Sequence, residues 1–461
     1  MLQAANGFGG LALTHLLANA GNVQPRLDLN GGLHHKAKVR RVVQLFMNGG
    51  VSQMDTFDYK PELAKRHGQM VDVGLKATAT GTPGPVMKSP FAWKQHGESG
   101  RWVTEVFPHL AGCVDDMAFL MAMASKTNVH GPASYLQTTG FLLPGFPSFG
   151  AWASYALGRL TDNLPTFVVL PDPRGLPYNG VGDFSAGFLP ASHQGTVIHA
   201  NSPTPIPDLA ASSNVAFATQ DAGKEGLDLL HQMNRRYAME RPGDSRLDAR
   251  VASYELAAKM QLAAPEAFDL SLESTSMHEQ YGTGAPAQEG GFARNCLLAR
   301  RLLERDVRFV QVWSGAGGAA NNWDNHGNIE KELPPIARQV DRPIAALLKD
   351  LKTRGMMDDT LVVWTTEFGR MPFTQSSTGR DHNGGTFVTW LAGAGIKGGT
   401  AHGQSDEFSY LADQGKTTCH DLHATILYLM GIDHERLTVR HNGIDRRLTD
   451  VHGQVIQAIL V

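Results

Sequence analysis

The chain has 461 residues, of which 42% are hydrophobic and 18% charged, with 50 glycines and 24 prolines. This composition indicates a large, loop-rich globular protein and excludes a disordered or coiled-coil chain. The net charge of −3 provides no basic surface for nucleic acid or an anionic membrane, so we expect neither as a partner.

Residues 1–37 are interpreted as a remnant export signal with a linker. The apolar stretch 7–20 ends in Ala18-Asn19-Ala20, an A-x-A-type cleavage site, and it is too short for a membrane span of about 20 residues. No Lys or Arg precedes Arg26, so the segment resembles a twin-arginine signal that lacks its first residues. We expect a periplasmic or extracellular protein if this signal works, and a cytoplasmic one if the segment is an ordinary helix.

Uninterrupted apolar runs predict strands that are buried on both faces. These runs cover 40–50, 117–125, 165–172, 307–315, 360–369 and 386–395. Between two of them, Ile336, Val340, Ile344 and Leu348 recur at four-residue spacing, which predicts a helix that ends before Gly355. Alternation of strands and helices predicts an α/β fold, with a mainly parallel sheet and helices on both faces.

The middle of the chain, 172–290, is interpreted as a loop-rich insertion. Residues 172–225 are dense in Pro, Gly, Ser and Asn, and helical patterns follow around 229–237 and 246–263. Long segments of this kind are usually functional loops or lids. We therefore expect one domain over 38–461, in which 172–290 packs beside the sheet and adds little to it.

Ligands of open α/β sheets bind at the carboxyl ends of the strands, where this sequence places carboxylates, imidazoles and one amide. Such side chains suit one or two hard or borderline divalent cations. The candidate metal ligands are Asn48, Asp55, Asp324, His326, Glu367, Asp381 and His382. Each alone has a simpler interpretation, as a cap, a turn or a structural ion pair. Their order at successive strand ends favours a common site.

The expected geometry of this site is specific. Ligand atoms sit about 2.0–2.5 Å from a cation, so those of Asp324, His326, Glu367 and His382 are expected within about 5 Å of one point. His326 is also expected to have an acceptor for its second ring nitrogen. Strands near 42–47, 308–313 and 360–366 must then be neighbours or near-neighbours.

Several segments also resemble a known family. They are RRVVQLFMNGGVSQMDTFDYKPEL, QEGGFARNCLLARRLLERDVRFVQVWSG, NWDNHGN, TLVVWTTEFGRMP, GRDHNGGTFVTWLAGAGIKGG and DLHATILYLMGIDHERLT. Over residues 38–460 the chain resembles the sulfatase-like "domain of unknown function" family of the alkaline phosphatase superfamily, which is bacterial and usually exported. The resemblance implies a three-layer α/β/α sandwich with a metal-centred site at the strand ends. It also implies hydrolysis of phosphate or sulfate esters, with two zincs, or one calcium or similar ion.

The match to the catalytic members of that superfamily is partial. The position of their first metal carboxylate holds Asn48 here, and Asp55 is the nearest acid. The segment HGPASYLQTTG resembles the sulfatase nucleophile motif with His130 at the position of the nucleophilic cysteine, which argues against formylglycine chemistry. Glu367-Phe368-Gly369 resembles an Asp-His-Gly motif without its histidine, which Asp381 and His382 are candidates to supply.

The leading hypothesis is therefore an exported, metal-dependent hydrolase of a small-molecule or carbohydrate phosphate or sulfate ester. Its divalent cation would be zinc, calcium or manganese, and His130, Arg380 and Lys126 are candidates for stabilising the transferred anion. The alternative is a non-catalytic protein of the same fold that binds a glycan or a protein partner. The sequence leaves the nucleophile, the identity of the metal and the oligomeric state open.

Overall fold

A sheet of nine strands forms the centre of the computed structural model, which describes residues 33–72, 74, 83–202, 205–206, parts of 226–239, 266–318, 322–376 and 378–461. The order of the sheet is β12 (Thr400–His402), β4 (Met117–Ala124), β11 (Phe387–Gly393), β8 (Thr360–Thr365), β1 (Arg41–Met47), β7 (Phe309–Ser314), β5 (Phe167–Leu170) and β6 (Thr196–Val197), with β15 (Thr417–Thr418) also beside β4. Among these described strands, only β11 runs antiparallel to its neighbours.

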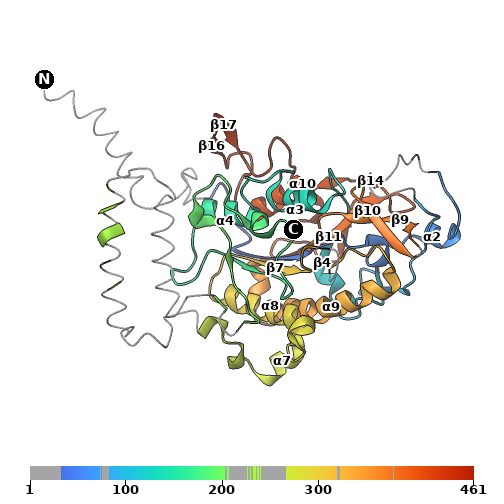
Figure 1. Ribbon diagram of the computed structural model, residues 1–461, viewed down its shortest axis with the longest axis horizontal. Helices are drawn as coiled ribbons and strands as arrows, with labels where there is room; N and C mark the ends of the chain where they lie inside the picture. The colour runs from blue at the N-terminus through green and yellow to red at the C-terminus, as the bar shows by residue number, and fades with distance from the viewer. Residues whose placement is uncertain are drawn as a thin grey trace.

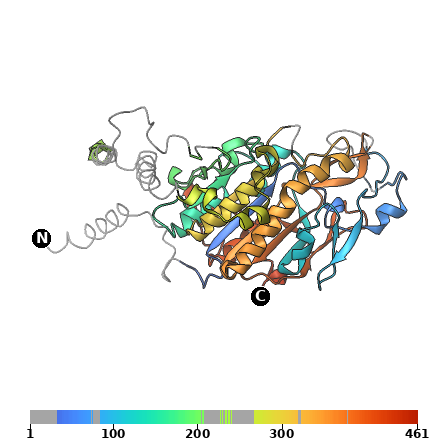
Figure 2. The ribbon, with the colours of Figure 1, turned by 90° about the horizontal axis from the view of Figure 1, so that it is seen from below.

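Helices cover both faces of the sheet because its central strands are apolar on both sides (Figure 1). On one face, Val43 and Leu45 of β1 pack in one core with α8 (Ala287–Glu304) and α9 (Ile329–Thr353). On the other face, Val42 and Phe46 pack with α4 (Phe149–Leu157) and α10 (Cys419–Leu429), and α3 (His130–Thr139) lies beside α10. Seen from below, α8 and α9 cross in front of the strands (Figure 2).

Smaller elements surround the three layers. They are the helices α2 (Pro61–Lys65) and α7 (Thr275–Tyr281), and the strand pairs β2 (Trp93–His96) with β3 (Arg101–Thr104), β9 (Gly369–Gln375) with β10 (Gly379–Asn383), β13 (Gln404–Ser405) with β14 (Ala412–Gln414), and β16 (Val439–His441) with β17 (Ile444–Arg446). Short 3-10 helices are η1 (Gln53–Asp55), η2 (Leu110–Asp116), η3 (Gly180–Phe184), η4 (Ala191–His193), η5 (Leu270–Leu272), η6 (Met356–Asp358) and η7 (Gln457–Ile459).

The predicted α/β sandwich with a mostly parallel sheet is confirmed. Each of the six apolar runs contains a strand of the sheet, and β7, β1 and β8 are adjacent as expected. The predicted helix is α9, which ends at Thr353, two residues before Gly355 turns the chain with a φ of 68°. The described part of 172–290 adds only the two-residue strand β6 to the sheet.

Three of the predicted segments lie wholly or partly outside the described residues. The stretch 7–20 with its Ala18-Asn19-Ala20 site and the helical pattern around 246–263 lie outside the described residues, and the pattern at 229–237 is described only in part. None of the described helices combines the length and the apolar composition that a membrane crossing requires.

Candidate metal centre

The parallel strands β4, β8, β1 and β7 end at the same edge of the sheet, and the segments that follow them build one polar cluster. His130 is the first residue of α3, after β4. Asp324 and His326 lie in the connection between β7 and α9, and His382 lies on β10. One ligand atom from each of these four residues lies within 4.8 Å of every other.

Each of the three histidines has an oxygen acceptor at Nδ1. That of His130 lies 2.7 Å from Oε1 of Glu367, and that of His382 lies 2.8 Å from the carbonyl oxygen of Asn128. Nδ1 of His326 contacts Oε1 of Gln375, which is the second-nitrogen acceptor expected for this residue. Because oxygen acceptors at Nδ1 favour the Nδ1–H tautomer, the Nε2 atoms are left with free lone pairs.

These Nε2 atoms converge on one carboxylate oxygen. Oδ1 of Asp324 lies 2.7 Å from Nε2 of His326, 3.0 Å from that of His382 and 3.2 Å from that of His130. The Nε2 atoms of His326 and His382 are 2.8 Å apart, and that of His130 is buried without a hydrogen bond. Lone pairs that face each other and a carboxylate repel one another, a repulsion that the guanidinium of Arg370 offsets from one side and that a bound cation would relieve. The donor set therefore fits a divalent cation.

The pKa shifts within the cluster reflect its burial and its two carboxylates. Burial alone would raise the pKa of Asp324, but its close contacts with the three imidazoles and the charge of Arg370 hold it far below its ordinary value, so the group is ionised. Burial works against a charged His130 too, yet the carboxylates of Asp324 and Glu367 raise its pKa. Burial lowers the pKa of His382 despite its contact with Asp324, which favours the neutral ring.

Glu367 contacts the cluster through the ring of His130. Its side chain is 0% exposed, and its Oε1 accepts hydrogen bonds from the backbone N–H of Gly49, at 2.8 Å, and from His130. Its Oε2 accepts one from the hydroxyl of Thr366 at 3.1 Å. A carboxylate beyond the imidazole raises the basicity of a ligand histidine and fixes its ring. The structure thus places Glu367 behind His130, outside the group of four.

Arg370 holds Asp324 from the side, a contact that the sequence analysis did not anticipate. Its guanidinium is fully buried, with Nη2 2.6 Å from Oδ1 of Asp324 and Nε 2.7 Å from the carbonyl oxygen of Gly50. Nη1 also bonds the carbonyl oxygen of Arg380. With its donors engaged in this way, Arg370 is a positioning residue. Its place three residues after Glu367, on β9, was the available signal.

Tyr178, from the middle of the chain, stacks on the ring of His130 with centroids 4.3 Å apart. Its hydroxyl donates to the carbonyl oxygen of Gly318 at 3.2 Å and accepts from Nδ2 of Asn322 at 3.0 Å. Burial and the nearby carboxylates of Asp324 and Glu367 raise its pKa, so the phenol stays neutral. No pattern within the loop around this tyrosine distinguished it in the sequence.

Asp55 and Arg380 lie together, apart from the four-residue group. Nε of Arg380 is 2.5 Å from Oδ2 of Asp55, Nη2 is 3.1 Å from Oδ1, and both side chains are fully buried. The hydroxyl of Ser52 also donates to Asp55, at 2.5 Å. The structure therefore places Asp55 in a bidentate ion pair instead of among metal ligands. Arg380, proposed from sequence to stabilise a transferred anion, has its charge engaged by Asp55.

The remaining sequence candidates occupy the periphery. Nδ2 of Asn48 donates to the carbonyl oxygen of Gly315 at 3.1 Å, while its Oδ1 is buried without a hydrogen-bond partner. Asp381 accepts the backbone N–H of His382 at 2.7 Å. Lys126 is exposed near the start of α10, where its charge acts on Cys419 and His420. Neither Asp381 nor Lys126 belongs to the group of four.

Two glycines allow the segments of the cluster to approach one another. A Cβ on Gly49, whose φ is 125°, would lie 2.7 Å from the backbone nitrogen of Asp324. A Cβ on Gly379 would lie 1.7 Å from the carbonyl oxygen of His326. In both places the obstacle is backbone, which cannot rotate out of the way.

Gly379→Ala is therefore expected to displace the His326 segment. Overpacking of this kind typically costs about 1–3 kcal/mol, and we expect weaker metal retention in addition. Urea unfolding and metal content after dialysis measure the two effects. Gly112→Ala, where a Cβ meets no atom within 4 Å, is the matched control and should change neither. Unchanged metal retention in Gly379→Ala would contradict the placement of this segment.

Comparison with solved structures gives distant likenesses. A sulfatase from Pseudoalteromonas sp. is 13% identical at a TM-score of 0.37, over 86% of this chain and 68% of that one. The lipoteichoic acid synthase of Listeria monocytogenes is 10% identical at 0.38, over 93% and 78%. Alkaline phosphatase from the Antarctic bacterium TAB5 is 12% identical at 0.34, over 86% and 99%. At these TM-scores the likenesses carry no argument about activity.

Sequence comparison identifies the family. No curated protein matches the chain. A family model does match residues 39–460, which is most of the chain and agrees with the span of the resemblance described from its motifs. The chain therefore belongs to the family described as "Protein of unknown function (DUF1501)".

Proposed function

We propose that this protein is a metal-dependent hydrolase of phosphate or sulfate esters, whose cation is held by His130, Asp324, His326 and His382. The observation that carries the proposal is the convergence of three Nε2 atoms on one ionised carboxylate, with an oxygen acceptor at each Nδ1. Three imidazoles suit zinc best among the candidate cations, while calcium takes oxygen ligands. Such a cation supplies a polarised ester oxygen and a bound water of lowered pKa.

Neighbouring side chains orient and charge the four proposed ligands. Glu367 and Gln375 orient two of the histidines, and Arg370 holds Asp324 ionised. His326 is the most exposed member, with 31% of its side chain accessible against 11% or 12% for the other three. Substrate would therefore approach past His326.

Water is the nucleophile that this arrangement favours. Ser52 donates to Asp55 and is 1% exposed, and Ser134, one turn along α3 from His130, is 0% exposed. Neither hydroxyl is accessible for attack on a bound ester. Hydrolysis would then proceed without a covalent intermediate on either serine.

The test combines metal content with turnover. The purified full chain is dialysed with zinc, manganese or calcium, freed of excess metal and analysed for bound metal. Each form is then assayed with p-nitrophenyl phosphate, bis(p-nitrophenyl) phosphate and p-nitrophenyl sulfate. We expect retained zinc or manganese and turnover of at least one ester. Retained metal with no turnover would contradict hydrolysis and favour a binding role, and absence of metal would contradict the site itself.

A further inference from the structure

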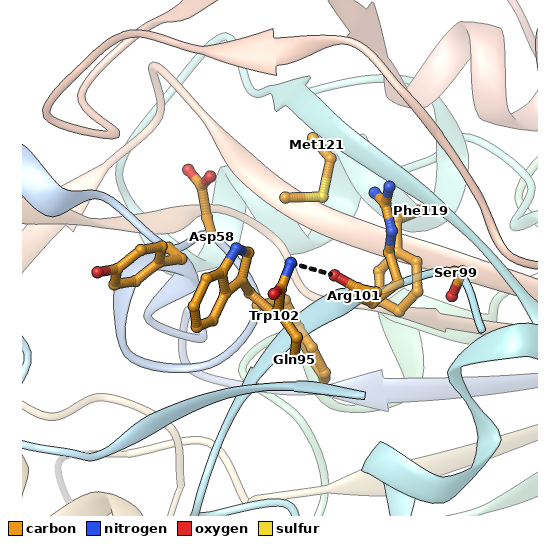
Figure 3. Close-up of a pocket in the computed structure, with 10 residues that line it drawn as sticks. Asp58, Gln95, Ser99, Arg101, Trp102, Phe119 and Met121 are labelled. Carbon is orange, nitrogen blue, oxygen red and sulfur yellow. Dashed lines mark hydrogen bonds between the residues drawn. The ribbon is translucent and has the colours of Figure 1, made fainter. Parts of the chain in front are cut away.

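A cavity of about 370 Å³ lies beside the β2–β3 hairpin and is lined by none of the metal-centre residues (Figure 3). Its walls come from residues 57–59, from the hairpin itself and from Phe119 and Met121 of β4. Small-molecule sites in proteins are typically clefts of about 300–1,000 Å³ with an apolar wall and a few polar groups. The volume and the mixed lining of this cavity match that description.

Two partly exposed aromatic side chains line the cavity. Tyr59 and Trp102 stack with centroids 4.3 Å apart and an interplanar angle of 30°. They remain 37% and 36% exposed, although large aromatic side chains usually bury most of their surface. The pair therefore presents a rigid, flat apolar surface that has no covering segment among the described residues.

Arg101 brings a positive charge to the same cavity. Its Nε is buried without a hydrogen-bond partner. In the part of the chain that the structure describes, its guanidinium forms no ion pair with an acidic side chain. A guanidinium without an acidic partner is available to an anion, and its planar fork matches a planar or tetrahedral oxyanion. The cavity thus favours an anionic ligand.

The one carboxylate in the lining does not cancel this charge. Asp58 is buried, and its Oδ2 accepts hydrogen bonds from the hydroxyls of Ser405 and Ser409. Its Oδ1 lies 3.4 Å from Nζ of Lys60. Asp58 is therefore already paired, which leaves Arg101 as the uncompensated charge.

The rest of the lining includes an amide that can bind hydroxyls. Nε2 of Gln95 donates to the carbonyl oxygen of Gly100 at 3.2 Å, which leaves its second proton and its Oε1 available (Figure 3). Ser99 also lines the cavity, although its hydroxyl oxygen is buried. An aryl acid would use the aromatic face and the cation but not this amide. A polyhydroxylated ring uses all three features.

We propose that this cavity, the hairpin pocket (Asp58, Tyr59, Gln95, Ser99, Arg101 and Trp102), binds a sugar that carries a sulfate or carboxylate group. The sugar ring lies against the Tyr59–Trp102 pair, and its anionic group pairs with the guanidinium of Arg101. The pocket is separate from the metal centre, so binding does not depend on hydrolysis.

Calorimetric titration of the full chain tests the proposal, after removal of metal with EDTA and dialysis so that the metal centre does not contribute. The probes are glucose 6-sulfate, glucuronate, glucose and benzenesulfonate. We expect one or both anionic sugars to bind more tightly than glucose and than benzenesulfonate. Arg101→Gln should weaken that binding at least about tenfold, equivalent to about 1.4 kcal/mol. Trp102→Leu should also weaken it.

The controls make each result decisive. Arg440→Gln removes a guanidinium whose side chain is 67% exposed on β16, outside the pocket, and should leave binding unchanged. Near-ultraviolet circular dichroism verifies the fold of each variant. The proposal is overturned if neither anionic sugar binds, if benzenesulfonate binds as tightly as the sugars, or if folded Arg101→Gln and Trp102→Leu bind like the wild type.

Discussion

His326→Ala is expected to abolish metal retention while leaving the metal-free protein folded. His326 contributes one of the Nε2 atoms that surround Asp324 Oδ1, and its side chain is 31% exposed in a connecting segment. Its loss removes a ligand but little core packing. A bound cation stabilises the native state by about 4 kcal/mol when its free concentration is about 1,000 times Kd, and the variant should lose this increment.

Thermal unfolding with and without metal separates the two contributions. With zinc or manganese present, the wild type should melt well above His326→Ala. After treatment with EDTA, the two should melt within about 5 °C of each other, since the remaining difference is the small contribution of a partly exposed side chain. His67→Ala, an exposed histidine outside the cluster, should behave like the wild type in both conditions.

Other results would assign His326 a different role. Early melting of the EDTA-treated variant would make it a structural histidine that holds Gln375 and the β9–β10 pair in place. Unchanged metal content would remove it from the ligand set altogether. The same design applies to His382, whose side chain is 11% exposed and whose loss should have a larger effect on the metal-free protein.

The sheet could be predicted from the sequence because its signal is local. Each central strand is an apolar run, and the order of strands and helices along the chain restricts the topology. The strand-end rule placed Asp324, His326, Glu367 and His382 in one group for the same reason, since β1, β7 and β8 are adjacent and parallel. The structure groups Asp324, His326 and His382 with His130, and Glu367 contacts this group through His130.

Contacts between segments that lie far apart in the chain could not be predicted from the sequence. Asp55 and Arg380 are separated by 325 positions, and nothing in either local motif indicates that one charge is the partner of the other. An unpaired acid near a strand end resembles a metal ligand, and an unpaired arginine resembles an anion-binding group. Only the fold shows that the two side chains satisfy each other.

Asp55→Ala is expected to cause the largest loss of stability of any change considered for these polar groups. Without the carboxylate, the guanidinium of Arg380 stays fully buried and keeps only its bonds to the carbonyl oxygens of Met371 and Met87, at 3.2 and 3.1 Å. Removing one partner of a buried ion pair typically costs about 3–5 kcal/mol, because the other charge is left uncompensated. Urea unfolding of the EDTA-treated protein measures the loss.

The metal dependence of this loss decides between the two interpretations of Asp55. If Asp55 pairs with Arg380, the variant is destabilised by the same amount with and without metal, and its metal content per folded chain is unchanged. If Asp55 were a ligand, the loss would disappear in EDTA and bound metal would fall. The double variant Asp55→Ala/Arg380→Met provides the control. Because it removes the buried charge and keeps an apolar side chain of similar length, it should recover part of the stability that Asp55→Ala loses.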